Sequence, residues 1–100
     1  MALEDIDTTN QLPPPQARRL LSYVLVHGVV LFSAHAKREM ANDGMTQQDV
    51  INLLRVGRIY EPGELVQGSW RYRCHTQLFC VVVAFSSVTQ SVVVTAWRKK

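Results

Sequence analysis

The sequence predicts an α+β fold in which N-terminal helices pack on a small antiparallel β-sheet. In the first half of the chain, apolar residues recur at three- and four-residue spacing, which is the pattern of amphipathic helices. After Gly57 the pattern changes to alternation and to short apolar runs, which are typical of strands. Helices first and strands last, joined by short links, favour a meandering antiparallel sheet over alternating strand and helix units.

The chain is long enough for one folded domain. Its 100 residues, of which 47% are hydrophobic, can supply one core but leave nothing for a second. The stretch up to Leu12 is polar and acidic, and the run Pro13-Pro14-Pro15 interrupts regular structure. We therefore expect residues 1–15 to be a disordered tail and residues 16–100 to form a single domain.

No segment of the sequence suits a membrane. No apolar run reaches the roughly eighteen residues that a membrane-spanning helix needs. The acidic start, with Glu4, Asp5 and Asp7, differs from the basic and then apolar pattern of a secretory signal. We expect a soluble, cytoplasmic protein.

The first helix is expected from about Gln16 to Val26, where apolar residues follow helical spacing and Gly28 offers a C-terminal cap. The short apolar run from Gly28 to Phe32 is β-branched, and it fits either a brief strand or an extended connection to the next helix.

Two further helices are expected in tandem. Ser33 is a credible N-cap for a helix that ends near Asn42. Thr46 stands three residues before Asp49, as in a capping box, and begins a helix that ends near Gly57.

Three strands are expected after these helices. Residues 69–75 alternate cleanly, and residues 91–97 follow the polar break at 86–90. Residues 79–85 are continuously apolar, as expected of a central strand that is covered on both faces.

The net charge of +3 is divided unevenly along the chain. The first 12 residues carry three acids and no base, so the remainder holds eleven bases and five acids, a net charge of +6. Such an excess attracts polyanions, although the same balance also keeps a domain soluble. The C-terminal run Arg98-Lys99-Lys100 could bind a nucleic-acid backbone or be a solubilising end.

The strand at residues 69–75 carries a possible anion-binding surface. Its alternation places Arg71, Arg73 and His75 on one face. Neighbouring like charges cost stability unless an anion or a carboxylate lies between them, and a phosphate would fill that place. The alternative is a solvated strand face that charge keeps soluble.

A second candidate group lies in the helix at residues 33–42. His35 and Glu39 are four residues apart, so their side chains lie on one side of the helix. A carboxylate that orients an imidazole suits a general acid or base near neutral pH, and Lys37 or Arg38 could stabilise a charged transition state. Surface decoration is the alternative, since most such helix pairs have no catalytic role.

Metal and cofactor chemistry are not indicated. Cys74 and Cys80 lack C-x-x-C spacing, so we expect two reduced thiols. Neither a Gly-rich phosphate loop nor a metal-ligand spacing is present, and we expect no cofactor and no metal site.

Several motifs stand in a fixed order along the chain: Phe32-Ser33-x-His35-Ala36-x-x-x-Met40, Asp43-Gly44-Met45-Thr46-x-x-Asp49-Val50, Leu54-x-x-Gly57, Gly68-x-Trp70-Arg71-Tyr72-Arg73 and Val93-Val94-Thr95-Ala96-Trp97. Together they resemble a family of small uncharacterised bacterial domains, grouped with the MqsR- and RelE-like toxins of toxin–antitoxin pairs. The resemblance covers residues 20–98. Many relatives place arginine where this chain has Glu39.

The resemblance implies a RelE/MqsR-like sheet flanked by helices and RNA cleavage without a metal ion. It also implies neutralisation by a cognate antitoxin protein, and the RNA could be messenger RNA on the ribosome. We assign His35 as general acid or base, Glu39 as its orienting partner and Arg71 and Arg73 as phosphate clamps, with His75 as the reserve acid.

Nucleic-acid contacts would come from five further basic residues: Lys37, Arg38, Arg98, Lys99 and Lys100. Two other classes stay open. One is a toxin or regulator that binds nucleic acid or protein without cleaving it. The other is an accessory module whose acidic tail and proline run dock a partner.

Overall fold

Three α-helices form within residues 3–100, the part of the chain that the computed structural model describes, and all begin and end close to the expected positions. They are α1 (Pro14–His27), α2 (Ala34–Asn42) and α3 (Gln47–Val56). Ser33 caps α2 by accepting a hydrogen bond from the amide of Ala36, and Thr46 and Asp49 form the expected capping box at α3. The helix caps in the sequence therefore predicted these ends correctly.

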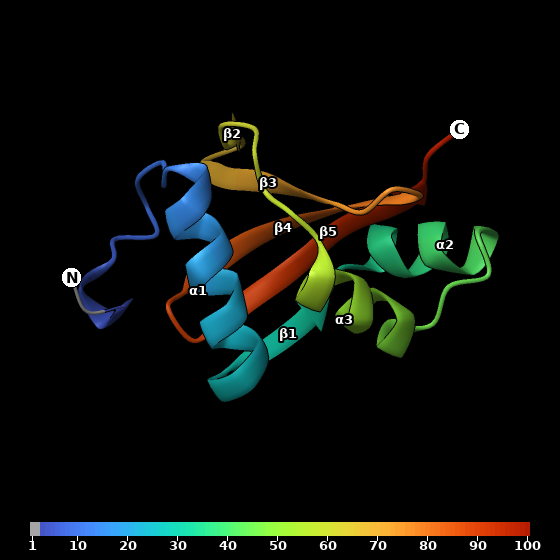
Figure 1. Cartoon of the computed structure of the whole chain (residues 1–100), viewed down its shortest axis with the longest axis horizontal. Helices are drawn as coiled ribbons and strands as arrows, with labels where there is room; N and C mark the ends of the chain where they lie inside the picture. Colours follow the sequence, from blue (N-terminus) through green and yellow to red (C-terminus); the bar gives the residue numbers. More distant parts are fainter. Residues whose placement is uncertain (1–2) are drawn as a thin grey trace.

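The strands form one five-stranded sheet in the order β1-β5-β4-β3-β2 (Figure 1). They are β1 (Val29–Phe32), β2 (Glu64–Val66), β3 (Ser69–His75), β4 (Phe79–Ser87) and β5 (Gln90–Arg98). β2, β3, β4 and β5 form an antiparallel meander, but β1 pairs with β5 in parallel. The expected purely antiparallel sheet was thus wrong. Parallel pairing needs a long crossover, and the chain between β1 and β5 provides one.

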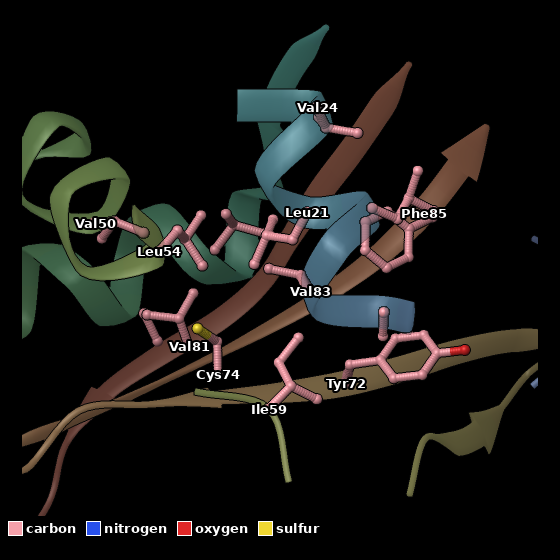
Figure 2. Packing of buried hydrophobic residues seen from close by; sticks show 14 of the residues in the cluster. Leu21, Val24, Val50, Leu54, Ile59, Tyr72, Cys74, Val81, Val83 and Phe85 are labelled. Carbon is pink, nitrogen blue, oxygen red and sulfur yellow. The ribbon is translucent and has the colours of Figure 1, made fainter. Parts of the chain in front are cut away.

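All three helices contribute to one hydrophobic core on one face of the sheet (Figure 2). Helix residues such as Leu21, Val24, Val50 and Leu54 meet the inward residues of the strands, which are Tyr72, Cys74, Val81, Val83, Phe85, Val93 and Ala96. Alternation along each strand sends the intervening side chains to the opposite face. This second face carries no helix from the described residues, and we call it the open face.

The central strand β4 is buried on both faces, as its sequence predicted. Residues 79–85 were expected to be a central strand covered on both faces, and residues 80–85 are buried although the helices lie against one face alone. Cys80, Val82 and Ala84 of β4 are still buried on the open face, because longer side chains flank them. Arg71 is the register partner of Ala84, and Arg73 that of Val82. Burial of β4 therefore comes from its neighbouring strands on this side.

The N-terminal segment packs against the sheet. Residues 1–15 were expected to be a disordered tail, but Ile6 and Leu12 are buried in the core. The amide of Leu12 donates to the hydroxyl of Tyr72 at 2.8 Å, and the indole of Trp70 donates to the carbonyl of Thr9 at 3.0 Å. Residues 3–15 are therefore packed on the domain and are not a disordered tail. Met1 and Ala2 lie outside the described residues. The two apolar side chains and the two hydrogen bonds offset part of the entropy cost of ordering this segment.

Helix α2 packs along β5, next to the point where β1 ends. The hydroxyl of Ser33 donates to the carbonyl of Val94 at 2.8 Å, and the amide of Arg98 donates to the carboxylate of Asp43 at 3.2 Å. Val94 is the extra residue of a β-bulge, since Val82 pairs with Thr95 and Val83 with Val93. The two capping residues of α2 thus form hydrogen bonds with backbone groups in the part of β5 that extends beyond β1.

Candidate functional site

The open face is hollowed between β2, β3 and β5. The hollow has a volume of about 670 Å³, and its polar and aromatic lining consists of Glu61, Glu64, Arg71, Arg73, Thr95 and Trp97. We call this hollow the groove. It lies on the opposite side of the sheet from the core, so its side chains are free of the packing demands of the helices.

Arg71 and Arg73 lie side by side in the groove, as the alternation of β3 predicted. The Nε atom of Arg71 is buried and has no hydrogen-bond partner within residues 3–100. The guanidinium of Arg73 lies over the ring of Trp97, 6.0 Å from its centroid. Glu64 is the register partner of Arg71, yet among the described residues neither arginine forms an ion pair. Two positive charges with unused donors are thus available to an anion.

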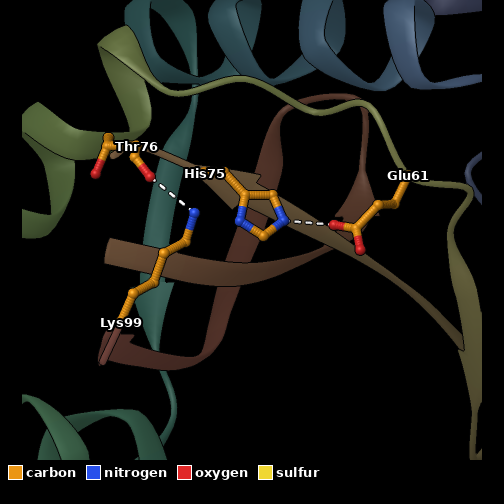
Figure 3. Close-up of polar contacts among 4 residues, drawn as sticks. All are labelled: Glu61, His75, Thr76 and Lys99. Atoms are coloured by element: carbon orange, nitrogen blue, oxygen red, sulfur yellow. Dashed lines mark hydrogen bonds and ion pairs between the residues drawn. The ribbon is translucent and has the colours of Figure 1, made fainter. Parts of the chain in front are cut away.

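His75 shares the face of the arginines but is not free. Its Nε2 atom hydrogen-bonds a carboxylate oxygen of Glu61 (Figure 3). The side chain of His75 is 12% exposed and that of Glu61 is 41% exposed. The ring of Tyr60 stacks on the imidazole with centroids 4.8 Å apart. The imidazole is therefore enclosed, while the carboxylate it holds is open to the groove.

The backbone brings Glu61 to His75. Arg58 and His75 form an isolated antiparallel bridge, with N–H···O distances of 2.8 Å in both directions. This bridge fixes the loop that follows α3 beside the end of β3, three residues before Glu61. The Nδ1 atom of His75 is buried and has no hydrogen-bond partner within the described chain.

A second hollow lies beyond the same pair, with a volume of about 460 Å³ and a lining of Arg58, Tyr60, His75, Thr76, Gln77 and Lys99, next to Val56. The ammonium of Lys99 donates to the carbonyl of Thr76 at 2.8 Å, so the charge is held at this hollow (Figure 3). We call it the lysine pocket. Glu61 lines the groove and His75 lines the lysine pocket, so their hydrogen bond joins the two hollows.

The remaining predicted residues lie apart from the groove. His35 is exposed on α2 and Glu39 is partly exposed, and neither lines the groove. Within residues 3–100 these two side chains share no hydrogen bond or ion pair. Ala36 and Met40 turn the buried side of α2 to the core, on the face opposite to Arg71. The structure therefore does not join His35 to the arginines as the sequence-based assignment required.

The basic residues divide between two places. Lys37 and Arg38 are exposed on α2, away from the groove. Arg98 lies over the ring of Phe79 at 5.7 Å, and Lys100 is exposed at the chain end. Of these predicted nucleic-acid contacts, Lys99 is the one that lines a hollow beside the Glu61–His75 pair.

Sequence reasoning missed Glu61 and Tyr60. They stand in a loop, and Glu61 is fourteen residues away from its partner His75. No helical or strand period relates residues at that separation, so the pattern carries no signal for the pair. The sequence offers one hint of this pair: an aromatic residue and an acid, Tyr60 and Glu61, follow shortly after Gly57, where a helix was predicted to end.

The cysteines are buried and free, as expected. Burial raises the pKa of the Cys80 thiol to about 11, although Arg73 and Lys99 nearby act in the opposite direction. Burial likewise raises the pKa of Cys74. Both thiols are thus protonated at neutral pH and poorly suited to act as nucleophiles.

Comparison with known proteins identifies one match. A family model described as Domain of unknown function (DUF4258) matches residues 32–98. No curated protein and no solved structure matches the chain. The matched segment contains the groove and the Glu61–His75 pair, while α1 and Lys99 lie outside it.

Two features are absent from the described residues. Within residues 3–100, no three His, Cys, Asp or Glu side chains gather as they would around a metal ion. None of the described helices combines the length and the apolar character that crossing a membrane requires.

Proposed function

Because this chain belongs to the family described as Domain of unknown function (DUF4258), its activity has to be inferred from its own residues, and we propose that it binds and cleaves RNA without a metal ion. In this proposal the groove takes single-stranded RNA on the open face of the sheet. Arg71 and Arg73 hold the phosphate that is attacked, and Glu61 accepts a proton.

One observation carries the proposal. Two guanidinium groups without a carboxylate partner line the same hollow as the half-exposed carboxylate of Glu61. A phosphodiester offers the negative charge that Arg71 and Arg73 lack, and it accepts bidentate hydrogen bonds from guanidinium groups. A nearby carboxylate is a base that the 2′-hydroxyl of RNA can use.

The chemistry follows from these roles. Glu61 takes the proton of the ribose 2′-hydroxyl, whose oxygen then attacks the adjacent phosphorus. The bond from phosphorus to the 5′-oxygen breaks, and water in the open groove protonates the departing oxygen. The arginines stabilise the added negative charge on the phosphate oxygens. The products are a 2′,3′-cyclic phosphate and a 5′-hydroxyl end.

His75 is a positioning residue in this scheme. Its hydrogen bond holds the carboxylate of Glu61, and Tyr60 packs on the ring to fix its orientation. This arrangement replaces the His35–Glu39 assignment, because His35 lies outside the groove.

We extend the proposal to a biological role. The ordered motifs resemble a family of small uncharacterised bacterial domains, and the grouping of that family with MqsR- and RelE-like toxins is our reason for proposing a toxin of a toxin–antitoxin pair. A cognate antitoxin protein would be its partner, and cytoplasmic RNA, free or on the ribosome, would be its target. Arg71 and Arg73, which form no ion pair among the described residues, are the groups of the groove that would contact a polyanionic substrate.

The test is cleavage of a labelled single-stranded RNA by the purified protein in the presence of EDTA. Glu61→Gln should lower the rate by about 10²–10⁴-fold, the usual contribution of a general base. Arg71→Ala/Arg73→Ala should also remove cleavage. His35→Ala separates the two assignments, and we expect it to cleave at the natural rate. Products ending in 2′,3′-cyclic phosphate would identify the reaction.

Cleavage that depends on His35 and not on Glu61 would overturn this mechanism. Induced expression in a bacterial host tests the toxin role, since growth arrest should be lost in the Glu61→Gln variant.

The enclosure of His75 favours a second candidate, an RNA-binding domain that does not cleave. The side chain of His75 is 12% exposed and is held by Glu61, so it is poorly placed to donate a proton to the departing oxygen. Binding that Arg71→Ala/Arg73→Ala removes, without any cleavage by the natural protein, would support this candidate.

A further inference from the structure

The lysine pocket has the features of a nucleotide subsite, and these features do not depend on the groove. Arg58 and Lys99 bring two positive charges to it, and no carboxylate lines it among the described residues. The hydrogen bond from Lys99 to the carbonyl of Thr76 leaves the ammonium two further donors. A phosphate group is the natural counter-charge for this pocket.

Tyr60 supplies an aromatic platform at the same place. One face of its ring stacks on His75, with an interplanar angle of 17°. The residue is nevertheless 62% exposed, so the other side of the ring is open to a ligand. A large exposed aromatic beside two cations is the combination with which proteins hold unpaired bases and their phosphates.

The two hollows share a boundary. Glu61 lines the groove, His75 lines the lysine pocket, and their hydrogen bond connects the two sites. A strand of RNA whose phosphate lies between Arg71 and Arg73 would therefore pass Glu61 and reach Tyr60 with its next nucleotide. The loop that carries Tyr60 is fixed by the bridge between Arg58 and His75.

We propose that the lysine pocket is a second nucleotide subsite, in which Tyr60 stacks an unpaired base and Arg58 and Lys99 bind the adjacent phosphate. This inference rests on the proposed function and specifies its substrate class. The substrate is single-stranded RNA with at least one further nucleotide beside the attacked phosphate. A duplex would be excluded, because a paired base cannot stack on Tyr60.

The test is binding of a fluorescent hexanucleotide with 2′-O-methyl groups, which removes the attacking hydroxyl and separates binding from cleavage. Fluorescence anisotropy gives the dissociation constant. Tyr60→Ala should weaken binding by about 5- to 150-fold, the range that base stacking on an aromatic ring contributes. Tyr60→Phe keeps the ring and should bind within about twofold of the natural protein.

The charges are tested by salt. Arg58→Gln/Lys99→Gln should reduce the slope of log K against log salt concentration by about 0.7 for each phosphate contact that is lost. Arg19→Gln, on the exposed side of α1, is the matched control and should leave the slope unchanged.

The outcomes separate this inference from the proposed function. If Tyr60→Ala and Arg58→Gln/Lys99→Gln bind like the natural protein while Arg71→Ala/Arg73→Ala loses binding, the lysine pocket is not a subsite and the groove assignment stands. Equal affinity of the natural protein for the hexanucleotide and its duplex would also overturn the inference. Absence of binding by the natural protein would overturn both proposals.

Discussion

The imidazole of His75 and the carboxylate of Glu61 share a hydrogen bond across fourteen residues of sequence. The imidazole is enclosed by Tyr60, whereas the carboxylate opens into the groove beside Arg71. Because the enclosed imidazole of His75 holds the carboxylate of Glu61, this carboxylate has a fixed position and still faces the groove. The pair therefore orients a carboxylate towards the face that carries Arg71 and Arg73.

This pair predicts a measurable coupling in stability. Urea unfolding of Glu61→Gln, His75→Asn and the double variant should give a coupling energy of about 0.2–1 kcal/mol, because Glu61 is partly exposed to water. Additive effects of the two substitutions would show that the hydrogen bond contributes nothing to the fold. The same cycle with His35 in place of His75 is the control, and it should be additive.

Packing of the N-terminal segment predicts that Tyr72→Phe destabilises the domain. The substitution leaves the buried amide of Leu12 without its acceptor, which costs about 1–3 kcal/mol. Chemical unfolding measures the loss, and Tyr23→Phe on α1 is the matched control with an expected change below about 0.5 kcal/mol. An unchanged unfolding midpoint for Tyr72→Phe would contradict the packing of this segment.

This packing also changes the meaning of a truncation. Deleting residues 1–12 would remove Ile6 and Leu12 from the core, so lost activity would reflect lost stability. Such a deletion therefore does not test whether the acidic segment docks a partner.

Arg18 predicts a second effect on stability. Its guanidinium donates to the carbonyl of Leu54 at 2.5 Å and to that of Arg55 at 3.1 Å, so it caps the C-terminal end of α3 from α1. Arg18→Met should cost about 1.5–3 kcal/mol in unfolding free energy, the range for hydrogen bonds to a charged group. Arg19→Met changes the exposed neighbour and should cost less than about 0.5 kcal/mol. Equal costs for both variants would refute this role.

The Cys80 thiol predicts a loss of stability at alkaline pH. Its pKa is raised from 9.0 to about 11 by burial, so the unfolded chain releases this proton first as the pH rises. The thiol therefore has no effect on the pH dependence below pH 9, and stability falls between pH 9 and 11. Urea unfolding across this range should show a steeper fall for the natural protein than for Cys80→Ala.

Burial also raises the pKa of Tyr72 above 10.0, which adds to the same loss in both proteins. The difference between the two slopes therefore isolates the thiol. Identical slopes would show that Cys80 is not protected in the folded state.

Local structure followed from local signals. Ser33 and Thr46 were recognisable as N-caps because a cap needs one side chain and an amide three residues away. The face shared by Arg71, Arg73 and His75 was equally predictable, since alternation is a property of any regular strand. These features depend on contacts between residues a few positions apart, so the sequence pattern predicts them directly.

The sequence pattern carries no comparable signal for contacts between segments that are far apart in the chain. The parallel direction of β1, the packing of Leu12 under the Tyr72 hydroxyl and the meeting of Glu61 with His75 all depend on where distant segments cross. An apolar run such as Val29–Phe32 fits a parallel strand as well as an antiparallel one. A proline run is compatible with a packed or an unpacked segment.

By itself, then, the sequence determined the helices with their caps, three of the four strands of the meander (β3, β4 and β5) and the basic face of β3. The tertiary structure alone decided that Glu61 is the acid that joins His75 on that face. It removed His35 from the groove and brought in Glu61, because the core fixes the side of the sheet on which α2 lies and the bridge at Arg58 fixes the loop beside β3. Side-chain periodicity is local, whereas the choice of partners across a sheet is set by the packing of the whole chain.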